Sequence, residues 1–182
     1  MIIKETGFDG LLIIEPSIFN DSRGYFFESF NLQNFKNAGI DYNPVQDNES
    51  QSVKGVIRGL HYQLNPFAQS KLIRVVKGTI LDVALDLRKS SPTFGKWFGI
   101  ELNSDKKNQL LIPRGFAHGF SVLSDIAVIQ YKCDNTYKPD YERGILLNDK
   151  ELNIDWRTDI SQAIISNKDK ANPTFREAEY NF

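Results

Sequence analysis

The sequence predicts an all-β protein, an antiparallel jelly-roll sandwich or barrel with a few short helices at its periphery and C-terminus. Short segments rich in Val, Ile, Leu, Phe and Tyr recur between turn residues. No long stretch with the 3.6-residue period of a helix connects them, and parallel strands need such crossovers, so the pattern argues against a parallel sheet. We expect strands over residues 11–15, 25–30, 72–76, 80–87, 97–102, 109–112 and 127–133.

Two short helices are predicted from their capping residues. Asn31 is placed to cap a helix that ends by Gly39, and Ser166 is placed to cap another near Asp169. The chain of 182 residues has the length of one domain, so we expect a single domain over 1–182, with short C-terminal helices within about 158–182.

Composition excludes several partners. The 22 basic and 23 acidic residues nearly cancel, so nothing indicates nucleic acid or an anionic membrane as partner. No apolar run approaches the roughly 18 residues of a membrane helix, and the start of the chain lacks the regions of a signal peptide. The single cysteine, Cys133, forms no internal disulfide, which agrees with a reducing compartment. We therefore expect a cytoplasmic protein.

Strand alternation places two polar side chains on inner faces. In the strand 127–133 the odd positions carry the apolar set, so Tyr131 points inward. Lys71 shares the parity of Ile73 and Val75. Burying an ammonium group without a partner is costly, so an inward lysine indicates a function.

Arg58 and His61 have opposite parity, so strict alternation cannot direct both side chains into one cavity. Gly59 between them predicts a β-bulge that changes the direction of one of them, a feature that is frequent beside active sites.

The settings of the only two histidines, His61 and His118, resemble the two signature motifs of a cupin barrel. In metal-binding cupins a second His and a Glu complete the ligand set. Gly55 precedes His61 as the signature expects, but Gln63 replaces the second His and Lys71 replaces the Glu. A lysine repels a divalent cation where a carboxylate binds it. We therefore expect the pocket without its metal, and no cofactor.

Five stretches together carry a closer resemblance. They are residues 45–48, 56–63, 69–74, 91–95 and 112–120. In this order and spacing they resemble the dTDP-4-dehydrorhamnose 3,5-epimerase family of dTDP-L-rhamnose and cell-surface polysaccharide biosynthesis. The likeness runs from about residue 7 to residue 170.

The resemblance implies a substrate and four catalytic residues. The substrate is a dTDP-linked 4-keto-6-deoxyhexose, in which the C4 carbonyl acidifies the C–H bonds at C3 and C5. Inversion needs a base on one face of the ring and an acid on the other. The resemblance implies that His61 is the base, that Asp169 orients its imidazole and that Tyr131 is the acid. Lys71 is placed to stabilise the enolate at the C4 oxygen.

The resemblance also implies a set of substrate-binding residues and a homodimer. In the family, part of the slot, including the strand that carries Arg23, comes from the other subunit, so we expect the N-terminal region of about 1–50 in the dimer contact. The matching positions are Arg23, Arg58 and Lys168 for the diphosphate, Gln46 and Asn48 for the nucleoside, Phe26 and Tyr137 for stacking on thymine, Glu28 and Glu142 for further polar contacts, and His118 for the substrate.

Several alternatives stay open from the sequence. Ser70 and Arg143 replace glycines that are common in the family, and the tail beyond Lys170 matches nothing in it. An epimerase that inverts only C3 or C5, or a ketoisomerase of a related sugar nucleotide, carries nearly the same residues. A metal-dependent cupin and a non-catalytic sugar-binding jelly roll are the more distant alternatives.

Overall fold

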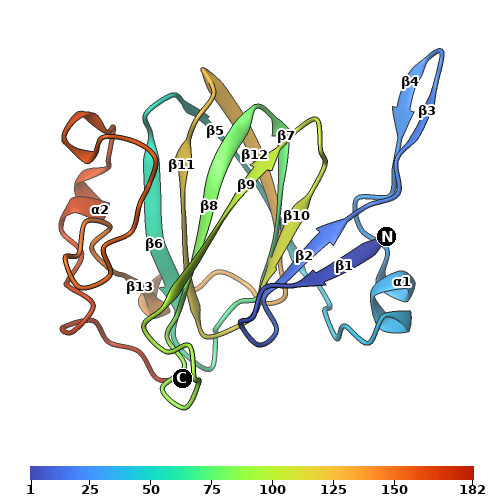
Figure 1. Cartoon of the computed structure of the whole chain (residues 1–182). Helices are drawn as coiled ribbons and strands as arrows, with labels where there is room; N and C mark the ends of the chain where they lie inside the picture. Colours follow the sequence, from blue (N-terminus) through green and yellow to red (C-terminus); the bar gives the residue numbers. More distant parts are fainter.

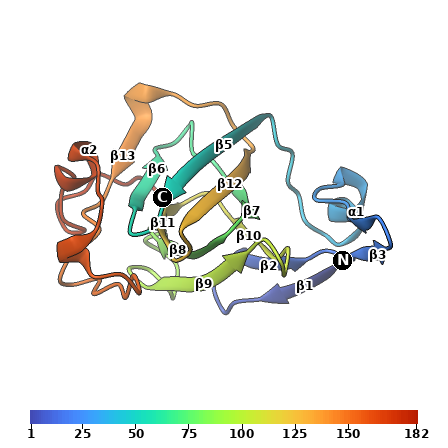
Figure 2. The same cartoon turned by 90° about the horizontal axis from the view of Figure 1, so that it is seen from above.

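A computed structural model describes all 182 residues and contains two large antiparallel sheets that curve around a common interior (Figures 1 and 2). The first sheet has six strands. In spatial order they are β1 (Ile2–Glu5), β2 (Leu12–Glu15), β10 (Gln109–Ile112), β7 (Lys71–Lys77), β12 (Ile126–Cys133) and β5 (Gln46–Val53).

The second sheet has five strands, and a separate hairpin has two. In spatial order the five strands are β13 (Glu142–Gly144), β6 (Ile57–Gln63), β11 (Phe116–Val122), β8 (Thr79–Asp86) and β9 (Trp97–Asn103). The hairpin of β3 (Phe19–Asp21) and β4 (Gly24–Phe26) stands away from both sheets (Figure 1). The two opposed antiparallel sheets confirm the predicted cupin-type fold class.

Both predicted helix caps are confirmed. The side chain of Asn31 accepts a hydrogen bond from the backbone N–H of Asn34 and starts α1 (Leu32–Asn37). Ser166 does the same for Asp169 and starts α2 (Asn167–Lys170). Two single 3₁₀ turns, η1 (Pro139–Tyr141) and η2 (Ile160–Gln162), complete the helical segments. No helix in the structure is long and apolar enough to cross a membrane.

The core explains why some strands are apolar on both faces. Between the sheets, Ile73 of β7 and Ala84 of β8 belong to one buried cluster. On the other face of the five-stranded sheet, Val83 packs in a second cluster with Trp156 and Phe175 of the C-terminal segment. This sheet is therefore buried on both sides, and β8 and β11 are buried along almost their whole length.

The predicted strand 25–30 is wrong beyond Phe26, where β4 ends. The aromatic residues that follow pack onto other elements instead of pairing as a strand. Phe27 lies under the guanidinium of Arg74, at 5.6 Å from the ring centroid, and Phe30 packs against Phe35 of α1. Apolar spacing alone does not distinguish these contacts from those of a strand.

The predicted β-bulge at Gly59 is confirmed. His61 of β6 lies opposite His118 of β11, but Arg58 lies opposite Phe120, so three steps along β6 match two along β11. Gly59 has a φ of 131°, and a side chain there would place its Cβ 2.5 Å from the Cα of Gly119. Only glycine fits this close approach of the two strands.

Candidate active site

A cavity of about 310 Å³ opens at the end of the barrel where β5, β6, β7, β12 and β13 meet. Its walls are mostly polar, in contrast to the apolar cluster deeper between the sheets. It contains seven of the residues that the sequence predicted for the site. The lining residues are Gln46, Asn48, His61, Tyr62, Gln63, Gln69, Lys71, Tyr131, Tyr137 and Glu142.

His61 is held by a buried carboxylate. Its Nε2 lies 2.7 Å from Oδ1 of Asp169, and the backbone N–H of Gly59 donates to Oδ2 of the same carboxylate at 3.4 Å. Burial raises the pKa of Asp169, but the hydrogen bond and charge of His61 and the Gly59 bond outweigh it, so the net pKa is lowered. An ionised Asp169 accepts a hydrogen bond from the N–H at Nε2 of His61, so Nδ1 is left as the nitrogen without a proton.

Lys71 and Tyr131 face the same cavity, as strand parity predicted. The Lys71 ammonium lies 6.0 Å from the centroid of the Tyr131 ring. Burial lowers the pKa of Lys71, against the opposing effects of Cys133, Asp82 and Glu142. Burial disfavours the charged form of Tyr131 as well, which in a phenol raises the pKa, so Tyr131 carries its proton at neutral pH.

A hydrogen-bonded chain borders the cavity. The hydroxyl of Tyr137 and the ammonium of Lys168 both donate to Oε2 of Glu142, each at 2.6 Å. The bond to Glu142 raises the pKa of Tyr137 to about 12. Burial raises the pKa of Glu142, but the bonds from Lys168 and Tyr137 outweigh it and keep the carboxylate ionised. Gln46 accepts from the backbone N–H of Tyr137 at 2.8 Å and donates to Asn48 at 3.1 Å.

A second cavity, of about 440 Å³, adjoins the first at His61. Arg58, Lys168 and Asp169 contribute to its walls. The Arg58 side chain is exposed and donates from Nε to the hydroxyl of Ser52 at 3.0 Å. Two cations thus lie beside His61, at a place where an anionic part of a ligand would be stabilised.

His118 does not line either cavity. It is buried, and its Nε2 lies 2.7 Å from Oδ1 of Asp82, a fully buried carboxylate of β8. Its predicted contact with the substrate stays a prediction. Asp82 was not singled out from the sequence, although it is an acidic residue of inward parity in an apolar strand, beside Ile80 and Ala84.

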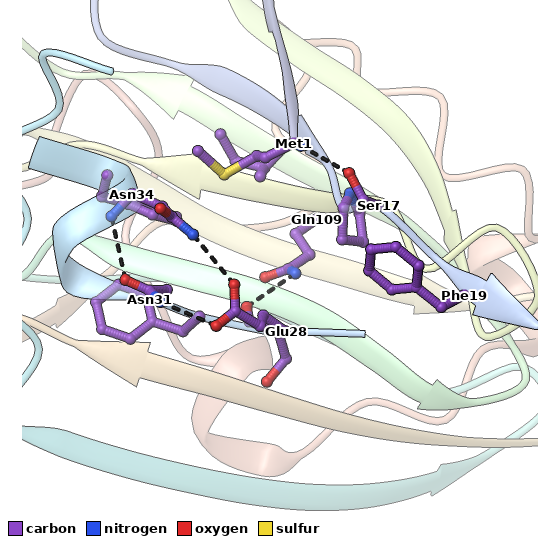
Figure 3. Close-up of a pocket in the computed structure, with 12 residues that line it drawn as sticks. Met1, Ser17, Phe19, Glu28, Asn31, Asn34 and Gln109 are labelled. Carbon is purple, nitrogen blue, oxygen red and sulfur yellow. Dashed lines mark hydrogen bonds between the residues drawn. The ribbon is translucent and has the colours of Figure 1, made fainter. Parts of the chain in front are cut away.

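Three predicted binding residues do not line the cavity within one chain. Arg23 sits at the turn of the β3–β4 hairpin and pairs with Asp21 at 2.6 Å, and Phe26 is 66% exposed (Figure 1). Glu28 lies in a separate pocket beside α1, where it accepts hydrogen bonds from Asn31 and Asn34 (Figure 3). A single chain does not bring these three residues to His61.

Gln63 has a structural role that the sequence did not indicate. Its amide nitrogen donates to the carbonyl of Phe67 at 2.6 Å, and its amide oxygen accepts from the backbone N–H of Lys138 at 2.6 Å. It therefore fixes the loop before Glu142 from the position where metal cupins carry a histidine. Nowhere in the structure do three His, Cys, Asp or Glu side chains lie together so that they could hold a metal ion.

The jelly roll, and a polar cavity with a carboxylate-oriented histidine at one end of it, define the class of a cupin-type epimerase. The sequence model of the family described as dTDP-4-dehydrorhamnose 3,5-epimerase matches residues 5–177, and the chain belongs to this family. The resemblance found in the sequence motifs is thereby confirmed.

Relatives of known sequence and structure agree. The dTDP-4-dehydrorhamnose 3,5-epimerase of Shigella flexneri is 52% identical over 181 residues, which is 99% of each chain. The crystal structure of the same enzyme from Elizabethkingia anophelis has a TM-score of 0.93 and 46% identity, with 97% of each chain covered. An epimerase from Legionella pneumophila, solved with dTDP-4-keto-L-rhamnose, has a TM-score of 0.92 and 46% identity over 97% of this chain and 93% of its own.

A less similar solved structure is a 3'-monoepimerase from Streptomyces bikiniensis, in complex with dTDP-quinovose. It has a TM-score of 0.86 and 34% identity over 92% of this chain and 85% of its own. The same fold thus also carries epimerisation at one carbon.

Proposed function

We propose that this protein inverts C3 and C5 of dTDP-4-dehydro-6-deoxy-D-glucose to give dTDP-4-dehydro-L-rhamnose, in dTDP-L-rhamnose biosynthesis. The observation that carries the proposal is that the His61–Asp169 pair opens onto the same cavity as Lys71 and Tyr131. A base, a cation and a phenol around one cavity are the groups that proton abstraction next to a carbonyl requires.

In the proposed reaction, Nδ1 of His61 removes the proton from C3 or C5, and Asp169 stabilises the imidazolium that forms. The electron pair of the broken C–H bond forms a double bond to C4, and the carbonyl pair moves onto the C4 oxygen, where the Lys71 ammonium stabilises the enolate. Tyr131 then gives its proton to the opposite face of the same carbon. His61 loses its proton to solvent and Tyr131 regains one, so each inversion leaves the protein unchanged. Lys71 supplies the positive charge, and the proposal needs no metal or redox cofactor.

The nucleotide is proposed to lie along the polar rim. Arg58 and Lys168, which border the cavity next to His61, would bind the diphosphate. Gln46 and Asn48 would contact the nucleoside, and the Tyr137 ring, 48% exposed as a residue, would stack on thymine. Glu142 would then hold Lys168 and Tyr137 in place for the ligand.

We also propose a homodimer in which the β3–β4 hairpin of one subunit completes the cavity of the other with Arg23, Phe26 and Glu28. The hairpin exposes Phe19, Tyr25 and Phe26 by 57–66%, an apolar surface that a partner would cover. A mixture of Arg23→Ala and His61→Asn subunits tests this, because one of the two sites in a mixed dimer would have both residues intact. Recovery of up to about a quarter of the wild-type activity is expected from random pairing. No recovery on mixing contradicts the shared site.

A cytoplasmic location is part of the proposal. It is supported by the free, buried thiol of Cys133, which suits a reducing compartment.

The experiment that tests the function is incubation with dTDP-4-dehydro-6-deoxy-D-glucose in heavy water. Deuterium at both C3 and C5, read by NMR, is the expected result. Label at neither carbon contradicts the function.

Epimerisation at a single carbon is the second candidate, favoured by the shared fold of the 3'-monoepimerase from Streptomyces bikiniensis. A ketoisomerase of a related sugar nucleotide is more distant. Deuterium at only one carbon would establish the mono-epimerase, and a product whose carbonyl has moved from C4 would establish the ketoisomerase.

A further inference from the structure

A second carboxylate lies buried between the two sheets, and only one of its oxygens has a hydrogen-bond partner. Asp82 is 0% exposed, and its Oδ1 lies 2.7 Å from Nε2 of His118. Its Oδ2 is buried and has no hydrogen-bond partner. A buried carboxylate oxygen without a donor is costly, so this one is expected to serve a purpose.

Asp82 and Lys71 both lie on the inner faces of their sheets, and Lys71 is the first residue of β7. On β8, Asp82 has the parity of Ile80 and Ala84, which pack between the sheets against Ile73 of β7. Lys71 lies two residues before Ile73 on the same face. The negative charge of Asp82 raises the pKa of Lys71, whereas burial lowers it. Asp82 thus favours the protonated form of the lysine.

The other groups around Lys71 do not supply a free negative charge. Burial raises the pKa of the Cys133 thiol to about 11, so it is neutral near pH 7. Tyr131 is also neutral there, because burial raises its pKa. Glu142 is already paired with the ammonium of Lys168. The charges of Cys133 of β12, Asp82 of β8 and Glu142 of β13 act on Lys71, and Tyr131 of β12 and His61 of β6 line the same cavity. The imidazole of His118 of β11 contacts Asp82.

We propose that Asp82 is a positioning residue for Lys71: its free Oδ2 is the counter-charge that keeps Lys71 an ammonium directed into the cavity, while His118 holds Oδ1. This rests on the proposed function, in which Lys71 must be charged to stabilise the enolate. It gives the second histidine an indirect task in the reaction, through Asp82.

The test is the ionisation of Lys71 in the protein without ligand, followed by NMR of lysine labelled at Cε, with Lys71→Met to assign the signal. Asp82→Asn removes the charge and keeps the shape, and is expected to lower the titration midpoint of Lys71 by about 1 pH unit or more. Asp82→Glu keeps the charge and is expected to restore most of the midpoint. An unchanged midpoint in Asp82→Asn would show that the charge of Asp82 does not act on Lys71, and would overturn the proposal.

Asp86→Asn is the matched control. Asp86 lies on the same strand and face and is equally buried, but its carboxylate is bonded by Arg88, Ser91 and Thr93. The same substitution there is expected to leave the midpoint of Lys71 unchanged. An equal shift in both variants would show a general loosening of the barrel and would overturn the specific role of Asp82.

If Asp82→Asn alone does not fold, the proposal is tested by a double-mutant cycle in which the urea unfolding midpoint is measured with and without Lys71. In a Lys71→Met background Asp82 has lost its partner, so adding Asp82→Asn is expected to move the urea midpoint upward. A midpoint that falls on adding Asp82→Asn to Lys71→Met would overturn the proposal. Neither measurement uses turnover. A wild-type protein that fails to exchange C3 and C5 protons while Asp82→Asn still shifts Lys71 would refute the proposed function alone.

Discussion

The two histidines form two nearly identical pairs that differ in their surroundings. In each, Nε2 lies 2.7 Å from Oδ1 of an aspartate, and the two histidines face each other across β6 and β11. The His61 side chain is 30% exposed and lines the cavity, whereas His118 is 10% exposed and does not. The two pairs have the same hydrogen-bond geometry, and only His61 reaches the cavity. We therefore propose that access to the cavity makes His61 the base, while His118 holds Asp82 in place.

The two aspartates differ in whether their second carboxylate oxygen has a hydrogen-bond donor. The second oxygen of Asp169 accepts a hydrogen bond from the backbone N–H of Gly59, and the first contacts His61. Both oxygens of this carboxylate therefore have a partner. The second oxygen of Asp82 has no such donor, so its charge is available to Lys71. In the proposed reaction, the bulge at Gly59 therefore supports the His61–Asp169 pair through its backbone N–H as well as through the direction of β6.

The largest effect is expected from His61→Asn. This substitution should lower kcat/KM by about 100- to 10,000-fold, because His61 performs the proton abstraction in the proposed reaction. Affinity for dTDP, measured by calorimetry, should stay within about threefold of wild type, since the cations near the diphosphate remain. Wild-type kcat/KM in this variant would refute the assignment.

Lys71→Met should come next, with a loss of about 100- to 1,000-fold in kcat, as for removal of one oxyanion donor. Lys132→Met is the control, because Lys132 lies on the outer side of β12 and pairs with Asp47 at 2.6 Å. Steady-state kinetics of the two variants separates the roles. A loss below tenfold for Lys71→Met would indicate that its ammonium merely reaches solvent.

Tyr131→Phe should affect turnover more than proton abstraction. Without the phenol, the opposite face lacks its acid, so the epimerised product should fall or change while deuterium still enters the substrate from His61. Tyr180→Phe is the control, since its ring packs against Phe175 away from the cavity. Normal product formation in Tyr131→Phe would place the acid elsewhere.

The smallest effect concerns stability. The folded state keeps the pKa of Asp169 below its unfolded value of about 4, so its ionised form stabilises the fold above that pH. This contribution is lost as pH falls through the folded pKa. Asp169→Asn should therefore lower the free energy of unfolding at pH 7 by about 1 to 3 kcal/mol, and by much less at pH 3. Urea unfolding at both pH values measures this, and an equal loss at both would contradict it.

The sequence was most informative where one residue type has a local physical task. Asn31 and Ser166 cap helices, Gly59 makes a bulge, and the parity of Lys71 and Tyr131 directs them inward; all five expectations agree with the structure. Each of these features depends on neighbours within a few residues, so each can be predicted from a single sequence.

Features that depend on distant partners were missed. The strands β5, β6 and β11 were not among those predicted, because β5 is a polar edge strand and glycines interrupt the apolar pattern of the other two. Asp82 was overlooked because its hydrogen-bond partner, His118, lies 36 residues away in the sequence. Within one chain the hairpin that carries Arg23 stays apart from the cavity, so its task in the site is still a prediction.

The most direct test compares the two histidines in one experiment. Wild type, His61→Asn and His118→Asn are each incubated with dTDP-4-dehydro-6-deoxy-D-glucose in heavy water, and deuterium at C3 and C5 is followed by NMR. His118→Asn should exchange both carbons more slowly than wild type, and His61→Asn should exchange neither. Equal exchange in the two variants would contradict the division of roles between the two pairs.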